Sequence, residues 1–167
     1  MMDTIQLRHW RKEDCNALAA IANNKKIWMN VRDRFPHPYT FKDALEWIDH
    51  TTKQSPVQNF AIIFNGQLAG SVGVTVKDDV YRKSIELGYF IGEPFWNKGV
   101  ATEAVRLILD FIRENFDVVR VYAEVFETNL GSMKVLEKNN FHLEGVRVKA
   151  VIKNKVLMND HVWVRFL

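Results

Sequence analysis

The sequence predicts a single α+β domain, and three observations support this prediction. About seven segments have the alternating or continuous apolar pattern of β-strands. Between two of these segments stands Asn65-Gly66, a pair that predicts a tight hairpin because both residues readily take positive φ. Residues 84–126 follow the order strand, loop, helix, strand, which is typical of a βαβ crossover. The expected strands are residues 4–8, 59–64, 68–76, 84–92, 118–126, 141–152 and 157–166.

Length and composition narrow the class of protein. The chain has 167 residues, of which 47% are hydrophobic and 26% are charged, so residues 1–167 fit one domain of ordinary globular composition. No apolar run reaches the roughly 20 residues of a membrane span, and the first residues carry no secretory leader. We therefore expect a cytoplasmic protein without a membrane partner.

Charge and metal-ligating residues exclude further classes. The net charge of +3 is scattered along the chain, which argues against nucleic acid as a partner. The single cysteine, Cys15, has no second cysteine with which to form an internal disulfide. The five histidines lack the spacing of metal ligands, so we expect no metal.

Apolar residues recur at helical spacing between the expected strands. Thr40 and Asp43 have the pattern of an N-terminal cap before an apolar helical face. Pro36 and Pro38 break the chain before this cap, after a helical turn that we expect at residues 27–32. The longer helices are expected at residues 14–22, 40–48, 101–114 and 129–140, the last with Asn139-Asn140 as its left-handed end.

The loop before the helix at residues 101–114 has the features of an anion-binding site. The first amide hydrogens of a helix have no partner within the helix, and the helix dipole favours negative charge at this end. Gly99 and Ala101 are small enough for a pyrophosphate to approach the backbone, and Lys98 adds a positive charge. The alternative is an ordinary strand-to-helix turn that needs glycine only for its geometry. The known phosphate-loop and dinucleotide motifs are absent from the sequence.

Three motifs resemble the GNAT family of N-acetyltransferases, and more narrowly its Rim-type branch of protein N-terminal acetyltransferases. The run Trp96-Asn97-Lys98-Gly99-Val100-Ala101 is similar to the acyl-CoA loop Q/R-x-x-G-x-G/A, with Trp96 in place of Gln or Arg. The strand at residues 86–91 and the run at residues 129–141 resemble two further motifs of the branch, the second with Asn140 where Gly is usual. The motifs stand in the family's order, and the resemblance covers nearly the whole chain.

The resemblance implies a fold, a donor and the residues that hold it. The implied fold is a mixed, mostly antiparallel sheet of about seven strands that splays between strands four and five and is flanked by helices. The implied co-substrate is acetyl-CoA, with its pyrophosphate on backbone amides of the loop and its pantetheine arm in the splay. A backbone amide near Phe90 or Ile91 is then expected to polarise the thioester carbonyl. The residues assigned to acetyl-CoA are Phe90, Ile91, Trp96, Asn97, Lys98, Gly99, Val100, Ala101, Thr102, Asn129 and Ser132.

Acetyl transfer to an amine needs a base, an oxyanion donor and an acid for the departing thiolate. Glu86 and Glu124 are the candidate bases because they lie on the two strands that border the expected cleft. Either carboxylate could instead be a salt-bridged strand residue. The resemblance makes Ser132 the candidate acid, although a serine in a first helical turn could simply cap the helix. Other hydroxyl candidates are Tyr89 and Tyr122.

The acceptor is less well defined than the donor. Part of the branch has a late glutamate as its proposed base, and Val151 stands at the matching position here. We expect direct attack by a primary amine in a ternary complex, with a protein N-terminus as the favoured acceptor. The alternatives are a small amine (a polyamine, an aminoglycoside or an amino acid) and a non-catalytic acyl-CoA-binding module, and a homodimer is left open. Acceptor-binding residues are expected among Trp28, Met29, Arg32, Arg34, Phe35 and Tyr39.

Overall fold

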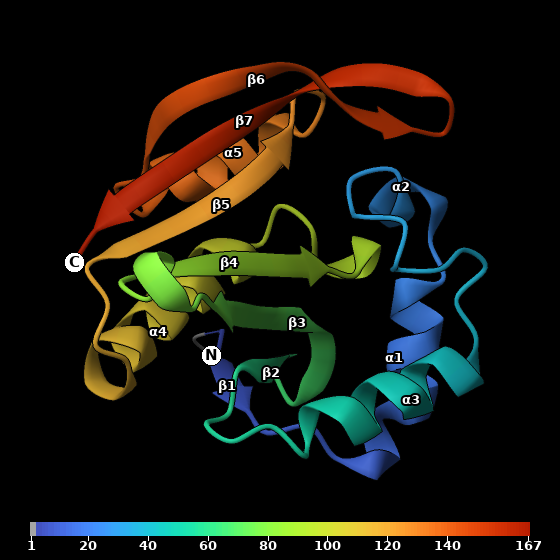
Figure 1. Cartoon of the computed structure of the whole chain (residues 1–167). Coiled ribbons are helices and arrows are strands. Elements are labelled where there is room, and N and C mark those ends of the chain that lie inside the picture. Colours follow the sequence, from blue (N-terminus) through green and yellow to red (C-terminus); the bar gives the residue numbers. More distant parts are fainter. Residues whose placement is uncertain (1–2) are drawn as a thin grey trace.

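The computed structural model, which describes residues 3–167, has one seven-stranded sheet with helices on both faces (Figure 1). This architecture confirms the predicted α+β class. The strands are β1 (Ile5–Arg8), β2 (Asn59–Phe64), β3 (Gln67–Val76), β4 (Ser84–Ile91), β5 (Arg120–Phe126), β6 (His142–Lys153) and β7 (Val156–Phe166). The helices are α1 (Cys15–Ala22), α2 (Lys25–Trp28), α3 (Phe41–Thr51), α4 (Val100–Asn115) and α5 (Leu130–Lys138).

The sheet opens between its fourth and fifth strands, as expected. The strand order is β1-β2-β3-β4-β5-β7-β6, and within residues 3–167 only β4 and β5 are parallel, joined by the α4 crossover. Their pairing extends only from Ser84 opposite Arg120 to Glu86 opposite Tyr122. Beyond Glu86 the two strands diverge, so the later residues of β4 have β3 as a neighbour on one side and a gap on the other. Figure 1 shows this gap between the green β4 and the orange β5.

Two apolar cores cover the two faces of the sheet. On one face, Ile108 and Leu109 of α4 pack with Leu136 of α5 against the odd-numbered residues of β4. On the other face, α1 and α3 pack through Leu18 and Ile48. Strand β2 serves both cores, because alternate residues of a strand point to opposite faces. This double burial explains why β2 is a nearly continuous apolar run in the sequence.

Local signals in the sequence correspond to the turns and caps of the structure. Asn65 and Gly66 have φ values of 48° and 81°, as a tight hairpin turn requires. Thr40 and Asp43 form a reciprocal capping box at the start of α3. Asn140 has φ of 59°, so it takes the left-handed conformation expected where the family has glycine.

The helical turn expected at residues 27–32 begins and ends earlier in the structure, so this prediction is corrected. The structure has α2 at Lys25–Trp28, and turns follow it. The helix begins earlier because the side chain of Asn24 accepts hydrogen bonds from the amides of Lys26 at 2.8 Å and Ile27 at 3.3 Å. The residues after Trp28 are therefore free to form the loop that faces the open part of the sheet.

Gly70 allows β3 to lie close to the end of β4, and we expect Gly70→Ala to destabilise the protein. An added Cβ would lie 2.2 Å from the carbonyl oxygen of Phe90 and 3.1 Å from the Cα of Ile91. Both are backbone atoms, so the β3–β4 ladder must shift, at a cost of about 1–3 kcal/mol. Urea unfolding measures this loss. Gly88→Ala is the control, because a Cβ there meets nothing within 4 Å; equal stability of the two variants would contradict the β3–β4 register.

Candidate active site

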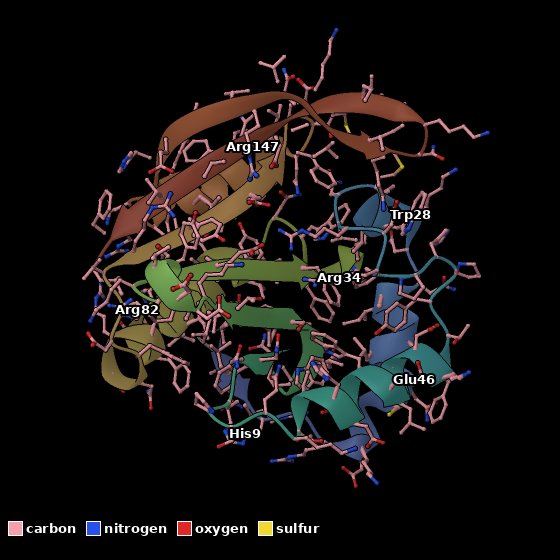
Figure 2. The ribbon with its side chains drawn as sticks, viewed as in Figure 1. His9, Trp28, Arg34, Glu46, Arg82 and Arg147 are labelled. Atoms are coloured by element: carbon pink, nitrogen blue, oxygen red, sulfur yellow. The ribbon has the colours of Figure 1, made fainter. Side chains whose placement is uncertain are left out.

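A cavity of about 1070 Å³ lies where β4 and β5 diverge. Its walls come from the loop after α2, from α3, from β3, β4 and β5, and from the β6–β7 hairpin. In Figure 2, Trp28 and Arg34 lie near α2, and Arg147 lies near β6. The cavity brings together several residues expected from the sequence: Arg32, Arg34, Phe35, Tyr39, Glu86, Tyr89, Phe90, Glu124, Asn129, Ser132 and Val151.

Glu86 is held by two cations at the point where β4 and β5 separate. Lys77 Nζ lies 2.7 Å from Glu86 Oε2, and the guanidinium of Arg32 contacts Glu86 Oε1. Burial raises the pKa of Glu86, but the hydrogen bond from Lys77 and the charges of Arg32 and Lys77 outweigh it and leave the pKa lowered. Glu86 is therefore an ionised carboxylate, so it can accept a proton from an amine.

Glu124 faces Glu86 across the cleft from β5. The same atom of Arg32, Nη2, that contacts Glu86 lies 2.8 Å from Glu124 Oε2. Arg147 contacts the other oxygen of Glu124 and, at 2.9 Å, Oδ2 of the buried Asp160. Burial raises the pKa of Asp160, and the charges of Arg147 and Arg32 oppose this rise. The contacts thus alternate cations with three carboxylates that line the cavity, in the order Lys77, Glu86, Arg32, Glu124, Arg147 and Asp160.

Tyr89 and Ser132 form a hydroxyl pair on the opposite face of β4. Tyr89 Oη lies 2.7 Å from Ser132 Oγ, and either oxygen can donate. Burial raises the pKa of Tyr89 above its ordinary value, so the phenol stays protonated. The cap of α5 comes from Asn129, whose side chain accepts a hydrogen bond from the Ser132 amide at 3.3 Å. Ser132 is thus not the capping residue, and its hydroxyl is directed to Tyr89.

The loop before α4 has the backbone of an anion site. Gly99 is the N-cap with φ of 75°, and Asn97 also has a positive φ, of 59°. The first intrahelical bond runs from the Glu103 amide to Gly99 O at 3.1 Å, so the preceding amides of α4 have no helical partner. Those amides belong to Val100, Ala101 and Thr102.

The side chains of the same loop contact other parts of the protein and so stabilise the conformation of the loop. Trp96 Nε1 donates to Ile91 O at 2.7 Å and so ties the loop to the end of β4. The ammonium of Lys98 lies 5.9 Å from the ring centres of both Phe64 and Phe95. The side chain of Val100 is buried in the core. These loop residues do not line the 1070 Å³ cavity, so the free amides of α4 lie apart from the carboxylates.

The register of β3 and β4 determines which backbone amide faces the gap. The Gly92 amide bonds Ala69 O at 2.8 Å, and alternate residues of an antiparallel strand bond to the same neighbour. Phe90, opposite Ser71, therefore directs its amide to β3, whereas Ile91 directs its amide towards the gap. Of the two residues expected to polarise the thioester, Ile91 is the one whose amide faces away from β3, and Phe90 packs its side chain on Phe35.

Lys153 connects the β6–β7 hairpin to the loop after α2, and both segments line the cavity. Its side chain is only 1% exposed, its Nζ lies 2.7 Å from Asp33 Oδ1, and it stands 4.0 Å from the ring centre of Trp28. The loop after α2 is thereby fastened to the β6–β7 hairpin. Val151, on the same hairpin, lines the cavity without supplying a carboxylate.

Sequence reasoning missed several residues of this site. Lys77 and Lys153 each follow the end of an expected strand, and Arg147 and Asp160 lie within expected strands, but none of them was predicted to have a role in the site. Their importance comes from contacts between distant parts of the chain, and no local pattern marks it.

Within residues 3–167 there is no helix long and apolar enough to cross a membrane, and no group of His, Cys, Asp and Glu that could hold a metal ion.

A splayed parallel pair of strands, a following helix with free N-terminal amides and an ionised glutamate in the cleft are the features expected of an N-acetyltransferase. A profile of the acetyltransferase (GNAT) domain matches residues 4–142. The chain therefore belongs to the GNAT acetyltransferase family, whose members are acetyl-CoA-dependent N-acetyltransferases.

Individual relatives agree with this assignment. YjcK of Bacillus subtilis, provisionally named an N-acetyltransferase, is 45% identical over 75 residues, which are 45% of this chain and 41% of that protein. YdaF of the same organism, provisionally named a ribosomal N-acetyltransferase, is 32% identical over 147 residues, 84% of this chain and 79% of that protein. The structure of RimL, a ribosomal L7/L12 alpha-N-protein acetyltransferase in complex with coenzyme A, has a TM-score of 0.87 at 17% identity and covers 98% of this chain and 94% of that chain. This similarity confirms the fold.

Proposed function

We propose that this protein transfers the acetyl group of acetyl-CoA to a primary amine by direct attack in a ternary complex, with a protein N-terminus as the acceptor. The observation that carries the proposal is the placement of three groups around one gap. An ionised Glu86 lies on one face of β4, the Tyr89–Ser132 hydroxyl pair lies on the other, and the Ile91 amide points between them. These groups match the base, acid and oxyanion donor that the reaction needs.

The residues present fit acetyl-CoA, which supplies an activated acetyl thioester. The amides of Val100, Ala101 and Thr102 are free to bind its pyrophosphate at the end of α4. Gly99 leaves open space there, since an added Cβ would meet nothing within 4 Å. Lys98, Asn97 and Trp96 shape this loop. Asn129 and Ser132 line the gap where the pantetheine arm would lie.

In the proposed reaction, Glu86 takes a proton from the attacking amine, directly or through a water, as the N–C bond forms. The Ile91 amide donates a hydrogen bond to the carbonyl oxygen, which gains negative charge. Ser132 gives a proton to the departing thiolate as the C–S bond breaks, and its hydroxyl is replenished through Tyr89. Glu86 later returns its proton to solvent. Glu124 is the second candidate base, since it reaches the same cleft from β5.

Three observations support a protein N-terminus as the acceptor. The cavity continues from the carboxylates along β3 towards α3, which leaves room for residues behind the reacting amine. An α-amine has a pKa near 8, so it needs less help from a weak carboxylate base than a lysine with a pKa near 10.4. YdaF and RimL both have names that refer to ribosomal proteins. A small amine is the second candidate, because the carboxylates would also bind a free cation.

The test is release of free thiol from acetyl-CoA with a panel of acceptors. The panel contains short peptides with free N-termini, the same peptides with blocked N-termini, spermidine, an aminoglycoside and free amino acids. We expect turnover with the free peptides and none with the blocked ones. Turnover only with spermidine or another small amine would replace the proposed acceptor, and CoA binding without thiol release for any acceptor would leave a non-catalytic binding module.

Removing the Ser132 hydroxyl should slow the departure of the thiolate. We expect Ser132→Ala to lower kcat about 10- to 100-fold, with less change in the KM for acetyl-CoA. Tyr89→Phe should lower kcat less, because Ser132 keeps its own proton. Steady-state kinetics measure both effects. Thr52→Ala, which removes a hydroxyl bonded within α3, is the control, and an unchanged kcat in Ser132→Ala would assign the acid role to another group.

A further inference from the structure

A single nitrogen of this chain occupies the space between the two cleft glutamates. Arg32 Nη2 contacts Glu86 on β4 and lies 2.8 Å from Glu124 on β5. A nitrogen that donates to two carboxylates at once has the contacts expected of a bound ammonium group. The arginine comes from the loop after α2, and its side chain is 45% exposed. Its guanidinium can therefore turn into solvent by side-chain rotation alone.

A third carboxylate in the same cavity has an unused oxygen. Asp160 is 4% exposed, and its Oδ1 has no hydrogen-bond partner among residues 3–167, while Oδ2 is bound by Arg147. A buried acceptor without a donor costs stability unless something else satisfies it. Asp160 lines the cavity, and Arg32 is near enough to affect its pKa. The unused oxygen therefore points to a donor that arrives from outside the chain.

We propose that Glu86, Glu124 and Asp160 bind the protonated amino group of the acceptor, and that Arg32 occupies this site until the acceptor displaces it. The inference rests on the proposed acetyl transfer and adds how its acceptor is recognised. Acceptors are bound as primary ammonium ions; one proton then passes to solvent before attack, and Glu86 takes the second as the N–C bond forms.

When Arg32 leaves, the contacts that remain around the three carboxylates fit a ligand with one positive charge and three N–H donors. Lys77 still holds Glu86 Oε2, and Arg147 still holds one oxygen of Glu124 and one of Asp160. One oxygen on each of the three carboxylates is then free, and a primary ammonium has three N–H groups. The charges agree with this count, because three carboxylates would face only two cations, and one added positive charge restores neutrality.

The experiment uses the full chain and methylammonium chloride as the probe, followed by amide chemical shifts in two-dimensional NMR spectra. We expect saturable shifts near Glu86 and Glu124, with an apparent Kd about tenfold lower in Arg32→Met than in the unmodified protein, since the internal competitor is gone. Arg32→Gln is measured as a second variant with the same expectation. Tetramethylammonium, which has the charge without N–H donors, should bind at least tenfold more weakly to Arg32→Met.

Arg106→Met is the matched control, because Arg106 also contacts two carboxylates, Glu103 and Asp110, but lies on the exposed face of α4. It should leave the methylammonium Kd unchanged. Equal or weaker methylammonium binding after loss of Arg32, or equal binding of the two probes, would overturn the proposal.

The binding measurement separates this proposal from the proposed function. Since it needs no turnover, saturable methylammonium binding in a protein that releases no thiol would refute only the acetyl transfer. An active enzyme whose acceptor KM rises or stays the same in Arg32→Met would refute only the displacement. If both proposals hold, Arg32→Met lowers the acceptor KM several-fold and leaves the KM for acetyl-CoA unchanged.

Discussion

Gly99→Val is expected to weaken CoA binding about 100-fold, through backbone strain and added bulk at the start of α4. Gly99 has φ of 75°, a conformation in which a β-branched residue is strained. Relief of that strain would turn the peptide before Val100 and move the free amides of α4 away from their common direction. The valine side chain would also fill the open space where the pyrophosphate is expected to lie. Calorimetric titration with CoA measures the change.

Gly66→Val is the matched control for this prediction. Gly66 also has a positive φ, of 81°, and open space around an added Cβ, but it lies in the β2–β3 turn and not in the loop that leads into α4. Each substitution should cost about 1–3 kcal/mol of folding free energy through the same strain. Only Gly99→Val should lose CoA affinity. An equal loss in both variants, or an unchanged affinity in Gly99→Val, would contradict a pyrophosphate site at this loop.

Glu86→Gln is expected to lower kcat about 100- to 1000-fold, because glutamine has the shape of glutamate but accepts no proton from an amine. The Kd for CoA should stay the same, since the anion site is built by α4 and its loop. Glu124→Gln should have a smaller effect if Glu86 is the base, and the larger effect if the roles are reversed. Glu144→Gln is the control, because Glu144 also pairs with an arginine on the sheet but does not line the cavity.

The pH profile adds an independent check on Glu86. Its pKa is lowered from the ordinary value of 4.5, so Glu86 is fully ionised from about pH 5.5 upward. The ion pairs of Glu86 therefore stabilise the fold above the ordinary pKa and lose this contribution as pH falls through the lowered value. A rise in kcat/KM between pH 6 and 9 would then report deprotonation of the acceptor amine. An acid limb near pH 6 that disappears in Glu86→Gln would contradict the lowered pKa.

Much of the fold was predictable because its signals are local. The Asn65-Gly66 turn, the capping box of Thr40 and Asp43, and the left-handed Asn140 each depend on residues close in sequence. The splay between β4 and β5 could be predicted only from the family resemblance, because no residue pattern in the sequence shows where the pairing of two parallel strands ends. The error at α2 also has a local cause, because the cap comes from Asn24, just before the expected turn.

The charge network of the cleft was not predictable in the same way. Arg32 lies 54 residues from Glu86 and 92 residues from Glu124 in sequence, and nothing in its surroundings marks it as their partner. Asn129 and Ser132 show a related limit. Both residues were expected at the gap, but the sequence did not reveal that Asn129 caps α5 and leaves the Ser132 hydroxyl to Tyr89.

The strand order has a consequence for the synthesis of this protein on the ribosome. Among residues 3–167, β6 pairs only with β7, and β7 lies between β5 and β6, so the strand in the middle of this half of the sheet is translated after both of its neighbours. Lys153, at the end of β6, closes the cleft by reaching Asp33, 120 residues earlier. A nascent chain that lacks β7 therefore leaves β6 without a partner strand and the β6–β7 side of the cavity incomplete. The proposed acceptor site is therefore completed only after β7 has been translated.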